Sequence, residues 1–129
     1  MAAGGVGSAR YSDPPTYSTI AYMDGIGDSA IWTGTYLAAE ALRLKATGAA
    51  DARANVKQLA ETLHVWLNVA GDPGVLARFA APAGTVFPFG VGDLNCGDGR
   101  SHCDVPYAGS SWDYIGHISR DQYQGVMVE

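Results

Sequence analysis

Three aspartates beside predicted helix starts are the residues of this 129-residue sequence best suited to chemistry. Asp24 and Asp28 lie in a Gly-rich segment directly before one predicted helix, and Asp121 lies in the first turn of another. Glycoside hydrolysis uses two carboxyl groups roughly 5–10 Å apart, so the catalytic hypothesis pairs Asp121 with Asp24 or Asp28. A structural alternative stays open, because Asp28 is a good N-cap residue and acidic first turns are common in helices.

Aromatic and polar side chains near these aspartates suit a polyhydroxylated ligand. An aromatic face packs on the C–H surface of a sugar, and an arginine pairs with a carboxylate in two parallel hydrogen bonds. The candidate substrate-binding residues are Trp32, Tyr36, Trp112, His117, Arg120, Gln122 and Tyr123. The alternative for Trp32 and Trp112 is a place in the core, where tryptophan is mostly found. His117 has the alternative of bonding a backbone carbonyl.

An oxygen-rich run before and after the first cysteine is a weak candidate for a calcium loop. Its candidate ligands are Asp93, Asn95, Asp98 and Asp104. A calcium-binding EF-hand loop has glycine at its sixth position and glutamate at its twelfth, whereas this run has Asp98 and Asp104 there. We therefore expect no metal or other cofactor, with calcium as the alternative.

The two cysteines, Cys96 and Cys103, bracket a short polar segment. We expect a local disulfide, which implies an oxidising compartment and hence an extracellular or periplasmic location. The alternative is a pair of free thiols in a cytosolic protein. The first ten residues have neither a basic start nor an apolar core, so they are not a complete signal peptide.

The composition predicts a folded single domain and excludes several classes of partner. Hydrophobic residues make up 47% of the chain and charged residues only 16%, which is not typical of a disordered protein. The net charge of −5 argues against nucleic acid or an anionic membrane surface as the partner. No run approaches the roughly 20 apolar residues of a membrane span.

Helical periodicity predicts two helices, over residues 29–47 and 52–70, joined by a short linker as an antiparallel hairpin. The apolar face of the first helix is expected to contain Ile31, Leu37, Ala38, Ala41, Leu42 and Leu44. Its polar face is expected to contain Thr33, Tyr36, Glu40, Arg43 and Thr47. The buried stripe of the second helix is expected to contain Val56, Leu59, Leu63, Trp66, Leu67 and Ala70.

The rest of the chain carries no helical period until its end. We expect residues 1–22 to form an extended Gly/Pro/Tyr-rich arm and residues 23–129 to form a single helical domain. Residues 72–110 are predicted to be a long Gly/Pro-rich loop with candidate short strands. A third helix is predicted to start at Ser119, with Gln122 completing a capping box, and to be cut short at Glu129. The predicted fold class is therefore mainly α.

Three stretches carry a resemblance to a known family: GDSAIWTGTYLAAEALRLKATGAADARANVKQLAETLHVW, GDPGVLARFAAP and WDYIGHISRDQYQGVM. They resemble six-hairpin glycosidase-like bacterial proteins of uncharacterised function, whose fold is an (α/α) toroid. The resemblance covers about residues 20–129. It implies a partial all-α toroid with a polar cleft lined by helix starts, and a carbohydrate as the ligand.

The resemblance also implies that most of a toroid is missing. Either the chain is a fragment, or copies of it self-associate to supply the remaining wall. The expected function is a carbohydrate-active protein that resembles a glycoside hydrolase and uses paired carboxylates. The alternatives are a non-catalytic carbohydrate-binding module and a self-assembling structural subunit.

Overall fold

The computed structural model describes residues 4–87, 90–91 and 94–127. Its α-helices are α1 (Ser29–Thr47), α2 (Ala50–Asn68) and α3 (Arg120–Val126), and a 3₁₀ turn, η1 (Ile26–Asp28), precedes α1. Its strands are β1 (Ser8–Tyr11), β2 (Ile20–Asp24), β3 (Phe79–Pro82), β4 (Gly90–Val91), β5 (Ser101–Tyr107) and β6 (Ser110–Ile115). Helices account for 41% of the chain and strands for 23%, so the fold is α+β and the expected mainly α class is wrong.

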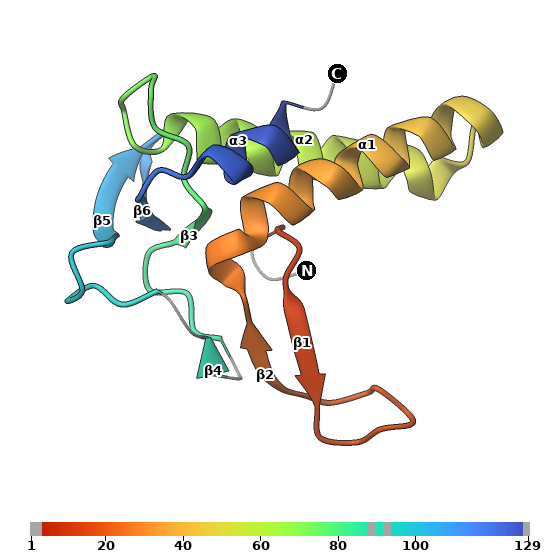
Figure 1. Cartoon of the computed structure of the whole chain (residues 1–129), viewed down its shortest axis with the longest axis horizontal. Coiled ribbons are helices and arrows are strands. Elements are labelled where there is room, and N and C mark those ends of the chain that lie inside the picture. Colours follow the sequence, from red (N-terminus) through yellow and green to blue (C-terminus); the bar gives the residue numbers. More distant parts are fainter. Residues whose placement is uncertain (1–3, 88–89, 92–93, 128–129) are drawn as a thin grey trace.

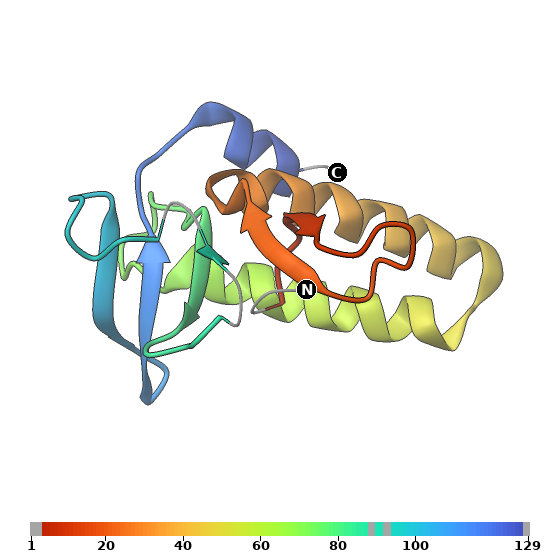
Figure 2. The same cartoon turned by 90° about the horizontal axis from the view of Figure 1, so that it is seen from below.

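Helices α1 and α2 lie side by side as the antiparallel hairpin that the periodicity predicts (Figure 1). The turn between them begins at Gly48, which has a φ of 66° and donates its N–H to the Leu44 carbonyl at 2.8 Å. A left-handed residue at this position is glycine in most helices, because glycine has no Cβ. Helix α3 packs along α1, and a small sheet covers one end of α2 (Figure 2).

The buried face of α1 differs from the one predicted. Thr33 and Glu40 are buried, whereas Leu42 is 68% exposed. The N-terminal segment explains part of this difference, because the Thr33 hydroxyl accepts the Val6 N–H at 2.9 Å and Ser29 donates to the Val6 carbonyl at 2.6 Å. A helix can bury hydroxyl groups at little cost when another segment supplies their hydrogen-bond partners.

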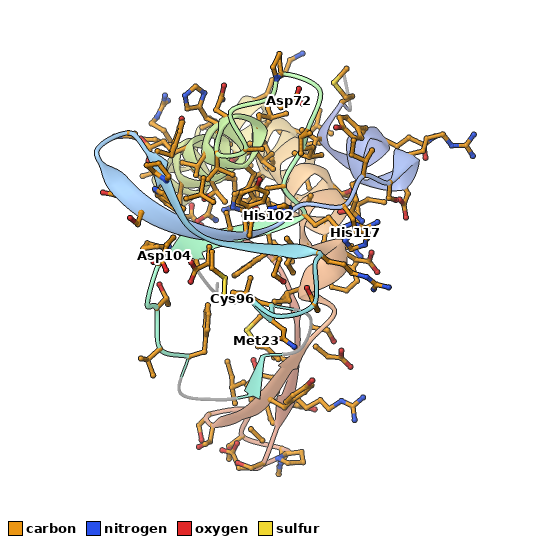
Figure 3. All side chains as sticks on the ribbon, turned by 90° about the vertical axis from the view of Figure 1, so that its left-hand side faces the viewer. Met23, Asp72, Cys96, His102, Asp104 and His117 are labelled. Carbon is orange, nitrogen blue, oxygen red and sulfur yellow. A yellow bond between two sulfur atoms is a disulfide. The ribbon has the colours of Figure 1, made fainter. Side chains whose placement is uncertain are left out.

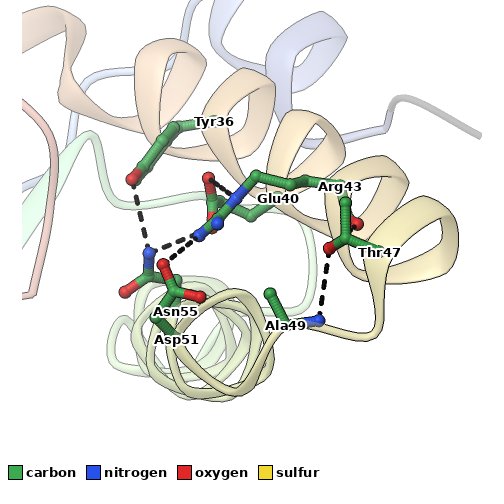
Figure 4. Close-up of polar contacts among 7 residues, drawn as sticks. All are labelled: Tyr36, Glu40, Arg43, Thr47, Ala49, Asp51 and Asn55. Carbon is green, nitrogen blue, oxygen red and sulfur yellow. Dashed lines mark hydrogen bonds and ion pairs between the residues drawn. The ribbon is translucent and has the colours of Figure 1, made fainter.

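Glu40 lies between α1 and α2 in a network of hydrogen bonds (Figure 4). Its carboxylate accepts from the Nε and Nη2 atoms of Arg43, at 2.8 Å for Nη2, and from Asn55 at 3.0 Å. Arg43 also reaches Asp51 on α2 at 2.9 Å. The hydrogen bonds from Arg43, and then that from Asn55, lower the pKa of Glu40, so the carboxylate stays charged in a site that is 7% exposed.

The region predicted to be one long loop contains an antiparallel sheet of order β3–β6–β5. Strands β5 and β6 are joined by Ala108 and Gly109, which have φ values of 50° and 79°. Positive φ at both positions is typical of the tight turns whose twist matches that of a β-hairpin. Pro106 is compatible with β5 because this is an edge strand, where a missing N–H costs little.

The N-terminal segment, predicted to be an extended arm, contains the β1–β2 hairpin. Strand β2 also pairs in parallel with the short strand β4, with Tyr22 opposite Gly90. Figure 1 shows that this hairpin points away from the helices and from the β3–β6–β5 sheet. Met23, near the end of β2, is buried in the core and anchors the base of the hairpin.

The hydrophobic core lies between α2 and the β3–β6–β5 sheet. Leu59, Leu63 and Trp66 of the predicted α2 stripe are fully or almost fully buried, whereas Leu67 is partly exposed. Trp66 donates its indole N–H to the Ala80 carbonyl at 3.2 Å, and its ring lies 5.7 Å from that of Phe79. A buried tryptophan is most stable when its polar atom has a partner of this kind.

Replacing Glu40 with glutamine is expected to lower the melting temperature near neutral pH. The Glu40 pKa is lower in the folded state than its ordinary value of 4.5, so its carboxylate stabilises the fold above that value. The difference between wild type and Glu40→Gln therefore shrinks as the pH falls through the folded-state pKa. Thermal unfolding followed by circular dichroism at several pH values measures it.

Glu61→Gln is the matched control, because Glu61 makes an exposed pair with Lys57 at 3.9 Å. Such pairs contribute little to stability. A Glu40→Gln variant as stable as Glu61→Gln at neutral pH contradicts the role given to the α1–α2 network.

Candidate functional site

A pocket of about 240 Å³ lies where four parts of the chain meet. The turn into α1, the residue before β3, the loop closed by the cysteines and the end of β6 all contribute to it. Its lining residues are Gly25, Gly27, Asp28, Arg78, Asp98, Arg100, Ile115 and His117. Figure 3 views this side of the molecule and labels His117 and Cys96.

Arg78 connects three of the segments around the pocket. Its Nη1 atom donates to the Gly27 carbonyl at 3.0 Å and lies 3.7 Å from the Asp28 carboxylate. Its Nε atom donates to the His117 carbonyl at 2.9 Å. The side chain is only 13% exposed, so it fixes the positions of the α1 start and of the segment after β6 relative to each other.

Asp28 occupies the N-cap position of α1, but its side chain makes no capping hydrogen bond. Its Oδ1 atom instead accepts from the Nε2 atom of Gln122 at 3.1 Å and faces Arg78. The carboxylate is half exposed, so it keeps acceptor capacity for a ligand.

Gln122 lies in the contact between α3 and α1 rather than on an open surface. It is 1% exposed, and its Oε1 atom accepts the Ile31 N–H at 3.1 Å. This contact satisfies a free N–H of the first turn of α1. An N-cap side chain such as that of Asp28 ordinarily has this role. Gln122 therefore holds the Asp28 side chain in place through a hydrogen bond from the α1–α3 contact.

Two glycines let α3 approach α1 closely enough for this contact. A Cβ on Gly34 would lie 2.0 Å from the Gly125 carbonyl oxygen, and a Cβ on Gly125 would lie 2.3 Å from the Ile31 Cα. Any side chain at either position would push the helices apart.

The expected disulfide joins Cys96 to Cys103, whose Cα atoms are 5.8 Å apart. The loop that it closes supplies Asp98 and Arg100 to the pocket. The Asp98 Oδ1 atom accepts the N–H groups of Arg100 at 2.8 Å and of Ser101 at 2.9 Å. These backbone hydrogen bonds lower the pKa of Asp98, so it is a carboxylate at neutral pH.

The pocket therefore presents two carboxylates and two guanidinium groups, whose formal charges cancel when His117 is neutral. Hydrogen-bond acceptors and donors both line it, beside the half-buried Gly25 and Gly27. Such a lining can bind adjacent hydroxyl groups. It is poorly suited to general acid catalysis by Asp98, because a general acid needs a raised pKa.

Of the three predicted catalytic aspartates, the structure places Asp28 in the pocket lining. Asp24 ends β2 and pairs with Arg10 of the β1–β2 hairpin at 3.5 Å. Asp121 is exposed on α3, and its Oδ1 atom accepts the Gln122 N–H at 3.1 Å. The carboxylate that shares the pocket with Asp28 is Asp98.

Of the predicted substrate-binding residues, His117 lines the pocket and the others lie elsewhere. Trp32 is half-buried, and its ring lies directly against Gly25, where a Cβ would come within 2.7 Å of it. Tyr36 reaches Asn55 of the α1–α2 network at 3.5 Å. Arg120 is exposed on α3 and is not part of the pocket lining.

Tyr123 and Trp112 make contacts away from the pocket. The Tyr123 hydroxyl donates to the Gly74 carbonyl at 2.6 Å and accepts the Leu76 N–H at 2.9 Å, so it holds the loop after α2 against α3. Trp112 lies in a separate groove of about 190 Å³ that it lines together with residues of α2, including Trp66. Its buried indole N–H has no hydrogen-bond partner within the described part of the chain.

The calcium candidates within the described residues do not form a common site. Asp93 lies outside the described residues. Asn95 accepts the Gly97 N–H at 3.1 Å, and Asp104 is exposed on β5. Across residues 4–87, 90–91 and 94–127, no three His, Cys, Asp or Glu side chains are close enough to hold a metal ion.

Sequence reasoning missed Arg78 and Arg100, and it considered Asp98 only as a calcium ligand. Arg78 carried a signal, since it is a single charge inside the apolar run from Val75 to Ala81. An ionic residue in such a run is buried only with partners. Arg100 carried no comparable signal.

The chain matches no protein-family model, no curated protein and no solved structure. The resemblance to six-hairpin glycosidase-like proteins therefore stays a hypothesis. No helix in the described part of the chain is both long and apolar enough to cross a membrane.

Replacing Gln122 with alanine is expected to destabilise the fold by about 1–3 kcal/mol, the usual cost of leaving a buried polar group without its partner. The Ile31 N–H loses its acceptor and Asp28 loses a donor. Urea unfolding measures the change. Gln124→Ala is the matched control, because Gln124 is an exposed residue of the same helix. Equal stability of the two variants contradicts the role given to Gln122.

Proposed function

We propose that this protein binds a neutral carbohydrate in the pocket around Asp28, Arg78, Asp98 and Arg100. The observation that carries the proposal is the balanced set of two carboxylates and two guanidinium groups beside the Gly25–Gly27 backbone. A carboxylate accepts from a pair of sugar hydroxyls, and a guanidinium donates to them. A strongly anionic ligand would leave the two carboxylates uncompensated.

Binding is favoured over hydrolysis at this site. Hydrolysis by paired carboxylates needs one carboxyl group that stays protonated, and the hydrogen bonds to Asp98 act in the opposite direction. Supporting features for a carbohydrate include the motifs that resemble glycosidase-like proteins. The disulfide is compatible with an extracellular location, and we propose that the protein works outside the cell or in the periplasm.

Arg100→Ala and Asp28→Ala are each expected to weaken sugar binding by about tenfold or more, since a hydrogen bond to a charged group contributes about 1.5–3 kcal/mol. Calorimetric titration with maltopentaose, cellopentaose and xylopentaose measures the effect, with trigalacturonate as an acidic comparison. We expect at least one neutral sugar to bind and the acidic one not to bind.

Arg120→Ala and Asp121→Ala are the matched controls, because both residues are exposed and lie outside the pocket. We expect them to leave affinity unchanged. Loss of binding in these variants, or wild-type protein that binds none of the neutral sugars, contradicts the proposal. Release of shorter sugars during the titration would favour the hydrolytic alternative.

A second candidate function, self-assembly, is favoured by the outward face of α1. Leu42 is 68% exposed there, and the exposed Ala39 and Ala46 lie three residues before it and four after it, on the same face. A face of this kind packs closely against a copy of itself, because alanine allows a short distance between helices.

If α1 mediates assembly, Leu42→Glu converts an oligomer to a monomer. Light scattering over a range of protein concentrations measures the mass. Leu67→Glu is the matched control, since Leu67 is a partly exposed leucine on α2. A wild-type protein that is monomeric at the highest concentration contradicts self-assembly.

A further inference from the structure

The disulfide loop forms one wall of the candidate sugar pocket. Between Cys96 and Cys103, Asp98 and Arg100 both reach the pocket, whose other charged groups, Asp28 and Arg78, lie on separate segments. The position of this loop therefore decides whether the four charges surround one space. A role of the disulfide in regulating this pocket rests on the proposed function of the pocket.

Hydrogen bonds hold the loop, and those made by the N–H groups of Gly97 and Arg100 are exposed to water. Asp98 binds the N–H groups of Arg100 and Ser101, and Asn95 binds the N–H of Gly97, all within the loop itself. Attachment to the sheet side comes from the Gly116 N–H, which donates to the Arg100 carbonyl at 2.9 Å, and from the pairing of Ser101 with Ile115 at the start of β5. The Asn95 N–H also donates to the Ser101 hydroxyl at 3.0 Å. The bonds from Gly97 and Arg100 shape the turn without fixing it to the body, and water competes for both because they are exposed. The bond between Asp98 and Ser101 is the one that links the turn to β5.

The disulfide connects this turn covalently to strand β5. Cys96 is exposed, whereas Cys103 is a half-buried residue of β5. Strand β5 is irregular between His102 and Val105, where its pairing with β6 shifts by a residue. The ladder hydrogen bonds are therefore interrupted next to Cys103, and the covalent link adds an attachment of the Cys96 side of the loop at this place.

We propose that the Cys96–Cys103 disulfide is a redox-sensitive clasp on the pocket, which binds its ligand when oxidised and loses affinity when reduced. A dithiol is the class of reductant required. Its thiolate attacks the exposed Cys96 Sγ, the S–S bond breaks, and Cys103 leaves as a thiolate that takes up a proton. The second thiol of the reductant then displaces Cys96 and closes the reductant's own disulfide. Two electrons pass to the protein, which gains two thiols.

Opening the clasp frees the Cys96 side of the loop, so that Asp98 and Arg100 are held at the pocket by hydrogen bonds alone. The Asp28–Arg78 pair stays, because Gln122 and the Gly27 carbonyl hold it independently of the loop. The reduced protein thus keeps its helical hairpin, and the loop side of its pocket is less firmly held. The same location of the disulfide makes the pocket specific to an oxidising compartment.

Amide hydrogen exchange measured by NMR tests the clasp without any ligand. The probes are the amides of Arg100, Ser101 and Gly116, and amides within α2 report on global stability. Dithiothreitol is expected to speed exchange at the three probes by about tenfold or more and to leave α2 unchanged. The double variant Cys96→Ser, Cys103→Ser is expected to do the same without reductant.

Unchanged exchange at the three probes overturns the clasp, because the loop would then hold its own shape. Faster exchange throughout α2 also overturns it, because the disulfide would then stabilise the whole fold. Titration with the neutral pentasaccharides adds a second readout, with an expected affinity loss of about tenfold on reduction. Equal affinity in both states overturns the clasp. An oxidised protein that binds no sugar contradicts the proposed function, and the exchange rates still decide the clasp.

Discussion

Trp66 is the residue through which the helical and β parts of the protein are joined. Its indole N–H binds the Ala80 carbonyl, and its own backbone carbonyl accepts the Ala77 N–H at 2.9 Å. These two contacts bracket Arg78, so the same tryptophan that fills the core also fixes the arginine at the pocket. A buried aromatic residue with both polar groups satisfied is rigid, which suits the support of a binding site.

The helices show that satisfied polar groups, as well as apolar area, decide which face is buried. Periodicity predicted both helices, because local propensity and 3.6-residue spacing are properties of a short segment. It failed for the orientation of α1, since Thr33 and Glu40 find their partners on Val6 and Asn55, which are distant in the sequence. With Thr33 and Glu40 on the buried face of α1, Leu42 lies on its exposed face.

The β-structure and most of the pocket could not be predicted for a related reason. Strands β3, β5 and β6 are short and interrupted by glycine, proline and an irregular pairing, so they lack the long alternation that identifies a strand. Asp28 and His117 were recognised as candidates because they flank helix starts. Arg78 and Arg100 reach the same pocket because strand pairing and the disulfide loop bring them there. The sequence does not show which distant segments pair. Cysteine spacing was informative because a disulfide between near neighbours needs little further context.

Gln122 illustrates how one sequence signal can have two physical meanings. Ser119 and Gln122 match a capping box, yet the glutamine side chain satisfies the first turn of α1 rather than that of its own helix. The close approach of Gly34 and Gly125 makes this exchange possible, because it brings the two helix starts within reach of one side chain. Asp28 is thereby released from capping and left with a half-exposed carboxylate. A residue that a helix would ordinarily use for its own stability thus keeps a half-exposed carboxylate in the lining of the pocket.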